Sequence, residues 1–124
     1  MTPFIVIGLG GFLGANVRYL VGGWIADRMG VGFPYGTLAI NVTGSFIIGL
    51  FLTLISERFV APPSARLFFA IGFLGAYTTF STFTFESLAL LQSRAYLLAA
   101  TNLVGSLVLG MVAVTLGVIV GRLV

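Results

Sequence analysis

The chain has 124 residues, of which 59% are hydrophobic and only 7% are charged. A soluble protein of this size could not cover so much apolar surface, since soluble domains carry about a quarter charged residues. The absence of Cys and His excludes thiol chemistry and the usual zinc sites, and the scattered arginines give no support to nucleic-acid binding. We therefore predict an all-α integral membrane protein, with residues 1–124 forming a single membrane domain.

Four apolar runs are long enough to cross a bilayer, which takes about 20 residues in a helix. In chain order, the expected spans are residues 4–25, 35–55, 66–91 and 95–120. Pro34 precedes the second span, and Pro62 and Pro63 form a stiff connection before the third. No room remains for a soluble domain, so any function must lie inside the membrane. We expect a multi-pass protein of the cell (inner or plasma) membrane that is not an enzyme.

Small residues recur at four-residue spacing in three of these spans, which lets helix backbones approach closely. The pairs are Gly10 and Gly14, Ser45 and Gly49, Ser106 and Gly110, and Gly117 and Gly121. Four helices alone make a thin bundle with little interior. A homodimer would supply eight helices, so oligomerisation is expected.

The arginines divide evenly between the two ends of the predicted bundle. With four spans, one end carries Arg58, Arg66 and Arg122, and the other carries Arg18, Arg28 and Arg94. The positive-inside rule needs an excess of basic residues on one side to set orientation. Three against three offers none, so dual topology and an antiparallel homodimer are predicted.

The third span contains an unusual polar interruption at residues 72–83, with two glycines, three threonines and a serine. Irregular backbone survives at membrane depth only where it is buried in protein or lines a cavity. We therefore expect the third helix to be broken near mid-membrane, where the break is a candidate ion or substrate site.

Polar side chains also follow the two neighbouring spans. Thr37, Asn41 and Ser45 share one face of the second span, and Asn102 and Ser106 repeat the spacing in the fourth. An asparagine amide has two donors and an acceptor, which are costly to leave in lipid. These two stripes predict a polar path beside the broken helix, although a lone Ser or Thr usually bonds its own helix.

Two phenylalanines follow the interruption on nearly the same helix face, Phe80 and Phe83. Thr79, Thr82 and Glu86 occupy an adjoining face. The edge of an aromatic ring is positive and can meet an anion without a counter-charge. From the residues alone, conduction of an anion is the furthest prediction.

Two charged residues lie within the spans and have several possible roles. Arg18, placed about one turn from the end of the first helix, could extend to the membrane surface, cap helix carbonyls or form a positive vestibule. Glu86 could carry a proton or act as a hydrogen-bonded lining group near a pore mouth.

Several motifs resemble the Fluc/CrcB family of fluoride channels over nearly the whole chain. They are the GGFLGA run at residues 10–15 followed by Arg18, the GTL run at 36–38 with Asn41, the TTFSTF run at 78–83, and Asn102 with Ser106. The TTFSTF run in a four-span protein is highly specific. Ala76 and Tyr77 depart from the family pattern, in which a glycine and a small aliphatic residue are common.

The resemblance implies an antiparallel, dual-topology homodimer with two fluoride pores and one structural sodium ion. The sodium ion would be held by the backbone carbonyls of Gly75 and Thr78, and Arg18 would lie near a vestibule. Thr79 and Glu86 are further lining candidates. The residues implied to form the fluoride pore are Asn41, Phe80, Ser81, Thr82, Phe83, Asn102 and Ser106.

The alternative is a proton-coupled exporter of the small multidrug resistance type, which is also short, four-span and of dual topology. Its coupling carboxylate lies in the first span, where this chain has no acid, so Glu86 would have to serve. A non-transporting assembly subunit is a third hypothesis, but it would not need Asn41 or the polar break.

Overall fold

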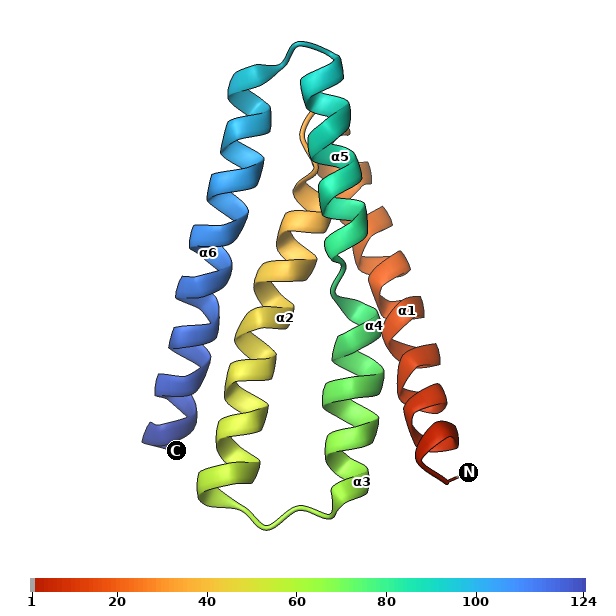
Figure 1. Ribbon diagram of the computed structural model, residues 1–124, viewed down its shortest axis with the longest axis vertical. Coiled ribbons are helices and arrows are strands. Elements are labelled where there is room, and N and C mark those ends of the chain that lie inside the picture. Colours follow the sequence, from red (N-terminus) through yellow and green to blue (C-terminus); the bar gives the residue numbers. More distant parts are fainter. Residues whose placement is uncertain (1) are drawn as a thin grey trace.

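The computed structural model describes residues 2–124 as a bundle of four long helical spans (Figure 1). All four are long and apolar enough to cross a membrane. The first is α1 and the fourth is α6, whereas the second and third are each built from several consecutive elements. The bounds are α1 Thr2–Met29, α2 Tyr35–Thr53, π-helix η1 Leu54–Arg58, α3 Pro63–Ala65, π-helix η2 Arg66–Leu74, α4 Gly75–Tyr77, α5 Phe80–Gln92 and α6 Tyr96–Leu123.

The helices extend a few residues beyond most of the apolar runs, and they end where the backbone chemistry requires it. Gly30 adopts a positive φ of 80°, which glycine tolerates, and its N–H closes α1 by donating to Ala26 O at 2.9 Å. Pro34 precedes α2, and Pro63 opens α3 at a position where its missing N–H costs nothing. The connections are short, as expected for antiparallel neighbours.

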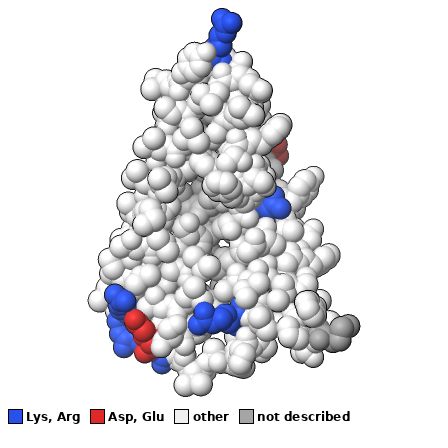
Figure 2. Space-filling view, in the orientation of Figure 1, with Lys and Arg blue, Asp and Glu red and all other residues white. Residues whose placement is uncertain are grey.

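Both chain ends lie at the same end of the bundle, together with the α2–α3 connection (Figure 1). The α1–α2 and α5–α6 connections lie at the opposite end. Helix α2 packs along α6, and α1 packs along η2 and α4. Charged side chains gather at the two ends, and the band between them is uncharged except for one basic and one acidic patch at one edge (Figure 2), as expected for a multi-pass membrane protein.

Glycines bring α1 into direct backbone contact with η2. A Cβ atom on Gly10 would overlap the carbonyl oxygen of Phe68, and one on Gly14 would overlap that of Phe73. Gly72 faces the α1 backbone in the same way. The prediction of close packing at Gly10 and Gly14 is confirmed.

Helices α2 and α6 meet through a second set of glycines. A Cβ on Gly49 would overlap the carbonyl oxygen of Val114, and one on Gly117 would overlap that of Phe46. Gly121 packs against the Thr53 side chain. Gly110 is less crowded, because a Cβ added there would lie 3.7 Å from Ser45 Oγ, at ordinary contact distance. The close packing predicted from the small-residue spacing is therefore confirmed at Gly49, Gly117 and Gly121.

The buried core of one chain is small. Ile40, Leu74 and Tyr77 form its centre, between α2 and the third span. Many large apolar side chains are exposed along α1, α5 and α6, which lipid or a second chain must cover. Among them are Phe12, Phe80, Phe85, Leu107 and Met111.

Candidate functional site: the break in the third span

The third span is interrupted by two extended residues nearly halfway along its length. Thr78 has φ −81° and ψ 157°, and Thr79 has φ −149° and ψ 119°. The break is therefore narrower than the predicted stretch of residues 72–83. Gly72 and Gly75 are both helical, so neither glycine supplies the extended conformation. Gly72 instead allows η2 to approach the α1 backbone closely.

The amides that follow the break are redirected from backbone to side-chain acceptors. In a continuous α-helix each N–H bonds the carbonyl four residues earlier, so Thr79 would serve Gly75 and Thr82 would serve Thr78. Instead, the Thr79 N–H donates to Asn41 Oδ1 at 2.8 Å, and the Thr82 N–H donates to Thr79 Oγ1 at 3.2 Å. The carbonyls of Gly75 and Thr78 thereby lose their helical donors.

Asn41 on α2 binds both backbone groups of Thr79. Besides accepting from the N–H, it donates through Nδ2 to Thr79 O at 3.0 Å. One side chain thus replaces the helix bond that the Thr79 N–H has lost, which is the compensation that irregular backbone in a membrane requires. It also adds a second donor to the Thr79 carbonyl, which as the N-cap carbonyl accepts the first bond of α5. Thr79 in turn caps the start of α5 through its hydroxyl.

Arg18, which lies on α1, binds the helical segment on the other side of the break. Its Nε donates to the carbonyl of Ala76 at 3.0 Å, near the carbonyl end of the helical run that closes at Tyr77. A cation is favourable there because the helix dipole is negative at that end. The prediction that Arg18 lies about one turn from the end of the first helix is wrong, because α1 continues to Met29. Of the three roles considered, capping of carbonyls is the one that this hydrogen bond supports.

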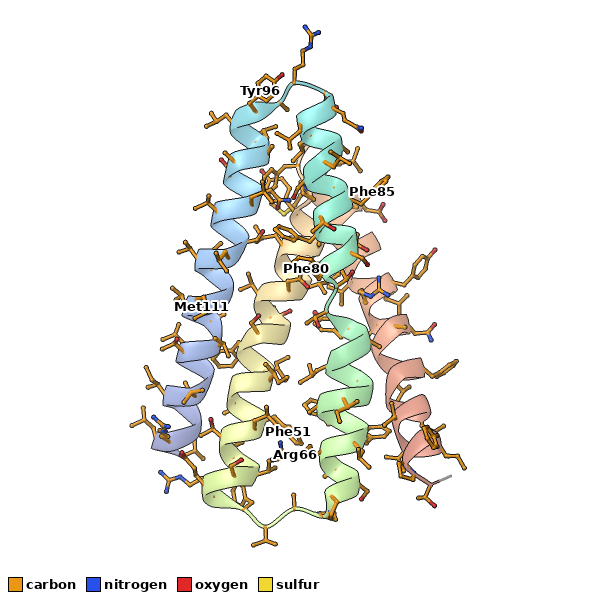
Figure 3. The ribbon with its side chains drawn as sticks, viewed as in Figure 1. Phe51, Arg66, Phe80, Phe85, Tyr96 and Met111 are labelled. Atoms are coloured by element: carbon orange, nitrogen blue, oxygen red, sulfur yellow. The ribbon has the colours of Figure 1, made fainter. Side chains whose placement is uncertain are left out.

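A cavity of about 320 Å³ lies between α2 and the break. Asn41, Thr78, Thr79, Phe80 and Phe83 contribute to its lining. The Phe80 and Phe83 ring centroids are 6.0 Å apart with the planes tilted by 53°. Phe80 is 77% exposed and lies directly after the break (Figure 3), so its ring is available to a partner or an ion.

A larger cavity of about 1160 Å³ extends from the break towards the α1–α2 connection. Arg18, Thr79, Thr82 and Glu86 are among its lining residues. Thr79 lines both cavities, so the break separates them. Within residues 2–124, Glu86 Oε1 is buried and has no hydrogen-bond partner. The wide cavity has the form of a vestibule, and Arg18 and Glu86 lie in its wall.

Three of the predicted pore residues lie outside both cavity linings of the single chain: Ser81, Asn102 and Ser106. Asn102 is 2% exposed and donates to Ser87 Oγ at 2.8 Å, and Ser106 donates to Asn102 Oδ1 at 3.3 Å. This network joins α6 to α5. Ser87 was missed by the sequence analysis, although the need of a buried asparagine for a partner was a signal that could have found it.

The break has the donor chemistry of a site for a hard cation at its carbonyls and for an anion at its amide, hydroxyl and ring-edge groups. Within residues 2–124, no three acidic, Cys or His side chains are grouped so that they could hold a metal ion.

Comparison with known proteins places the chain in a family. The family model described as "CrcB-like protein, Camphor Resistance (CrcB)" matches residues 5–118. The protein named "Fluoride-specific ion channel FluC" from Acidobacterium capsulatum is 50% identical over 119 residues, covering 96% of this chain and 95% of that protein. A protein of the same name from Chloroflexus aurantiacus is 48% identical over 122 residues, covering 98% and 97%. The resemblance found in the motifs is confirmed, and the chain belongs to the CrcB-like protein family.

Proposed function

We propose that the chain forms a fluoride-selective channel, which passively exports fluoride across the cell (inner or plasma) membrane and lowers cytoplasmic fluoride. The similar proteins are named fluoride-specific ion channels, and a channel activity is not an enzymatic one. The observation that carries the proposal is the break. There the N–H groups of Thr79 and Thr82 bond side chains, which leaves two backbone carbonyls without their helical donors. These carbonyls lie beside a cavity that hydroxyl, amide and phenylalanine groups line.

The proposed path leads from the vestibule past the break. Fluoride holds its water strongly, so the path must offer donors and ring edges in its place. Full counter-charges would hold the ion too tightly, since conduction needs binding weak enough to release it. Thr79 and Glu86 line the path from the vestibule, and Asn102 holds Ser106 in place. The groups that replace the water are those of Asn41, Phe80, Ser81, Thr82, Phe83 and Ser106.

The functional unit that we propose is an antiparallel, dual-topology homodimer with two pores. Gly75, Phe80 and Ser81 are exposed on the break side of one chain, and free carbonyls facing lipid would be costly. A second copy would cover them. Because Arg18 lies beside the break and not at an end of the bundle, the count is Arg58, Arg66 and Arg122 against Arg28 and Arg94. An excess of one arginine is small, which supports insertion in both orientations.

The carbonyls of Gly75 and Thr78 fit a structural sodium ion shared by the two chains. They are the two oxygens whose helical donors are redirected, to Asn41 Oδ1 and Thr79 Oγ1. Oxygen ligands suit a hard cation, and two carbonyls from each chain would supply four. When bound, the ion adds a fixed positive potential near the pores.

The deciding experiment uses the purified protein in liposomes loaded with potassium fluoride. Valinomycin sets the membrane potential, and an electrode selective for fluoride records efflux. Fast, electrogenic efflux that does not depend on a proton gradient supports the channel. Slow flux that requires a proton gradient would overturn it in favour of a coupled exporter of the small multidrug resistance type, in which Glu86, with its buried unpartnered oxygen, carries the proton.

A further inference from the structure

A hydrogen bond that the proposed pore does not use ties the break to α2. Tyr77, the last residue of α4, is 6% exposed, and its hydroxyl lies 2.9 Å from Thr43 Oγ1. The Thr43 hydroxyl also lies 2.7 Å from Ala39 O and 3.1 Å from Ile40 O of its own helix, and these carbonyls can only accept its single proton. This arrangement favours Tyr77 as the donor to Thr43.

Thr43 lies on the opposite flank of α2 from Asn41. Residues advance by about 100° around a helix, so Asn41 and Thr43 fall on either side of Gly44. A Cβ on Gly44 would overlap the Thr78 methyl group and lie 3.3 Å from the Tyr77 ring. The break thus lies across α2 at a glycine, with a hydrogen bond to Thr79 on one flank and one to Tyr77 on the other.

Packing holds the Tyr77 ring independently of its hydroxyl. The ring stacks on Phe73 with centroids 6.0 Å apart and planes 14° from parallel. Phe73 stacks on Phe69 at 5.4 Å, and Phe69 contacts Phe51 at 4.7 Å. A change from tyrosine to phenylalanine would keep this aromatic column and remove only the bond to Thr43.

We propose that Tyr77 and Thr43 form a positioning pair, which fixes the end of α4 against α2 and so holds the peptide group between Tyr77 and Thr78, through which the chain enters the break. Asn41 already holds the peptide groups on both sides of Thr79, and Arg18 holds the carbonyl of Ala76. Besides this pair, Thr78 is held on its N-terminal side by its bonds to Leu74 O, at 3.0 Å from its N–H and 2.9 Å from its hydroxyl. This inference rests on the proposed function for its effect on ion flux, but not for its effect on the break itself.

The test is a double-mutant cycle on fluoride efflux from liposomes. Tyr77→Phe and Thr43→Val should each lower the rate about three- to tenfold, the factor that one hydrogen bond typically supplies. The double variant should be no slower than either single variant, because both remove the same bond. Thr43→Ser keeps the hydroxyl and should restore the rate. Tyr96→Phe is the matched control, since Tyr96 is 62% exposed and lies at the start of α6, far from the break (Figure 3).

Hydrogen–deuterium exchange of the peptide that covers the break gives a readout that does not need ion flux. Tyr77→Phe and Thr43→Val should speed exchange of the Thr78 and Thr79 amides, and Thr43→Ser and Tyr96→Phe should not. Additive losses in the double variant, or unchanged exchange in both single variants, would overturn the positioning pair. If the wild-type protein passes no fluoride, the proposed function fails, and the exchange data alone then decide on the pair.

Discussion

Two regions of this molecule solve the same problem, the joining of helices in lipid, in opposite ways. The α1–η2 and α2–α6 contacts are made by glycines that bring one backbone against another. The break is held by polar side chains that reach in from α1 and α2, namely those of Arg18, Asn41 and Thr43. The glycine contacts have no exposed polar group that needs a hydrogen-bond partner. The polar side chains at the break supply such partners to backbone groups.

The difference follows from the solvent. Lipid tails are as apolar as the side chains, so burial alone does not drive helices together in a bilayer, and close packing takes its place. A break removes helix hydrogen bonds that no water in the bilayer core can replace. The glycine contacts therefore set where the helices lie. The polar side chains at the break set the conformation of the two residues that interrupt the third span. Substitutions in the two regions should fail differently.

The largest effect is expected at Asn41. Asn41→Leu removes the acceptor of the Thr79 N–H and the second donor to the Thr79 carbonyl. A buried group left unsatisfied costs about 1–3 kcal/mol. We expect a clear fall in the thermal unfolding midpoint and loss of fluoride efflux. Asn16→Leu is the matched control, because Asn16 is exposed and donates only within α1, to Phe12 O at 2.6 Å. Equal shifts in the two variants would show that the bonds to Thr79 do not hold the break.

The next effect is expected at the glycine contact of α1 with η2. A methyl group at residue 14 would overlap the backbone oxygen of Phe73, which cannot turn away as a side chain could. Gly14→Ala should therefore destabilise the fold by about 1–3 kcal/mol through overpacking. Gly8→Ala should be near neutral, since a Cβ atom added at Gly8 would have no atom of residues 2–124 within 4 Å apart from its own stretch of α1. Thermal unfolding in detergent compares them, and equal stability would contradict the close approach.

The glycine contacts could be predicted from the sequence, whereas the details of the break could not. Spacing of four residues places Gly10 and Gly14 on one helix face, and that is sufficient to predict a close contact. The break was assigned to residues 72–83 because glycines suggest irregular backbone, yet only Thr78 and Thr79 leave the helix. Its position depends on Asn41, which is 38 residues away in the chain, and no local pattern reports such a partner.

Long-range partners also account for what the sequence could not predict at the site. Arg18 reaches Ala76 across 58 residues, so the sequence left three roles open. Asn102 was placed in the pore because a polar stripe marks one helix face, but its amide is used by Ser87 on the neighbouring helix. Side-chain type and spacing predicted which residues need partners, and the fold decided which partners they have.

A third variant distinguishes a role of Phe80 in the ion path from a role in packing. Phe80→Ile removes a ring that is 77% exposed in the single chain, so it should leave folding intact. Isoleucine keeps this position apolar, so dimer assembly should also persist. Fluoride efflux should fall about tenfold, the largest factor that a ring-edge contact of 0.5–1.5 kcal/mol allows. Phe85→Ile is the control: its ring is 72% exposed but lies about 140° around α5 and lines neither cavity. A Phe80→Ile protein that dissociates and keeps its flux per dimer would assign Phe80 to packing.

The smallest effect is expected at the charged end of the bundle, where an exposed ion pair joins α6 to η1. Arg122 bonds Glu57 through Nε at 3.2 Å and Nη2 at 3.3 Å, but the two side chains are 63% and 44% exposed. Such a pair contributes about 0–1 kcal/mol and is screened by salt. The unfolding midpoint of Arg122→Gln should therefore lie close to that of the wild-type protein, and the difference should shrink between low and high sodium chloride. Arg94→Gln, at an exposed turn of the opposite end, controls for the loss of charge alone. A large difference that persists in high salt would mean that this end is covered in the assembled protein, and that the pair belongs with the buried contacts of the bundle.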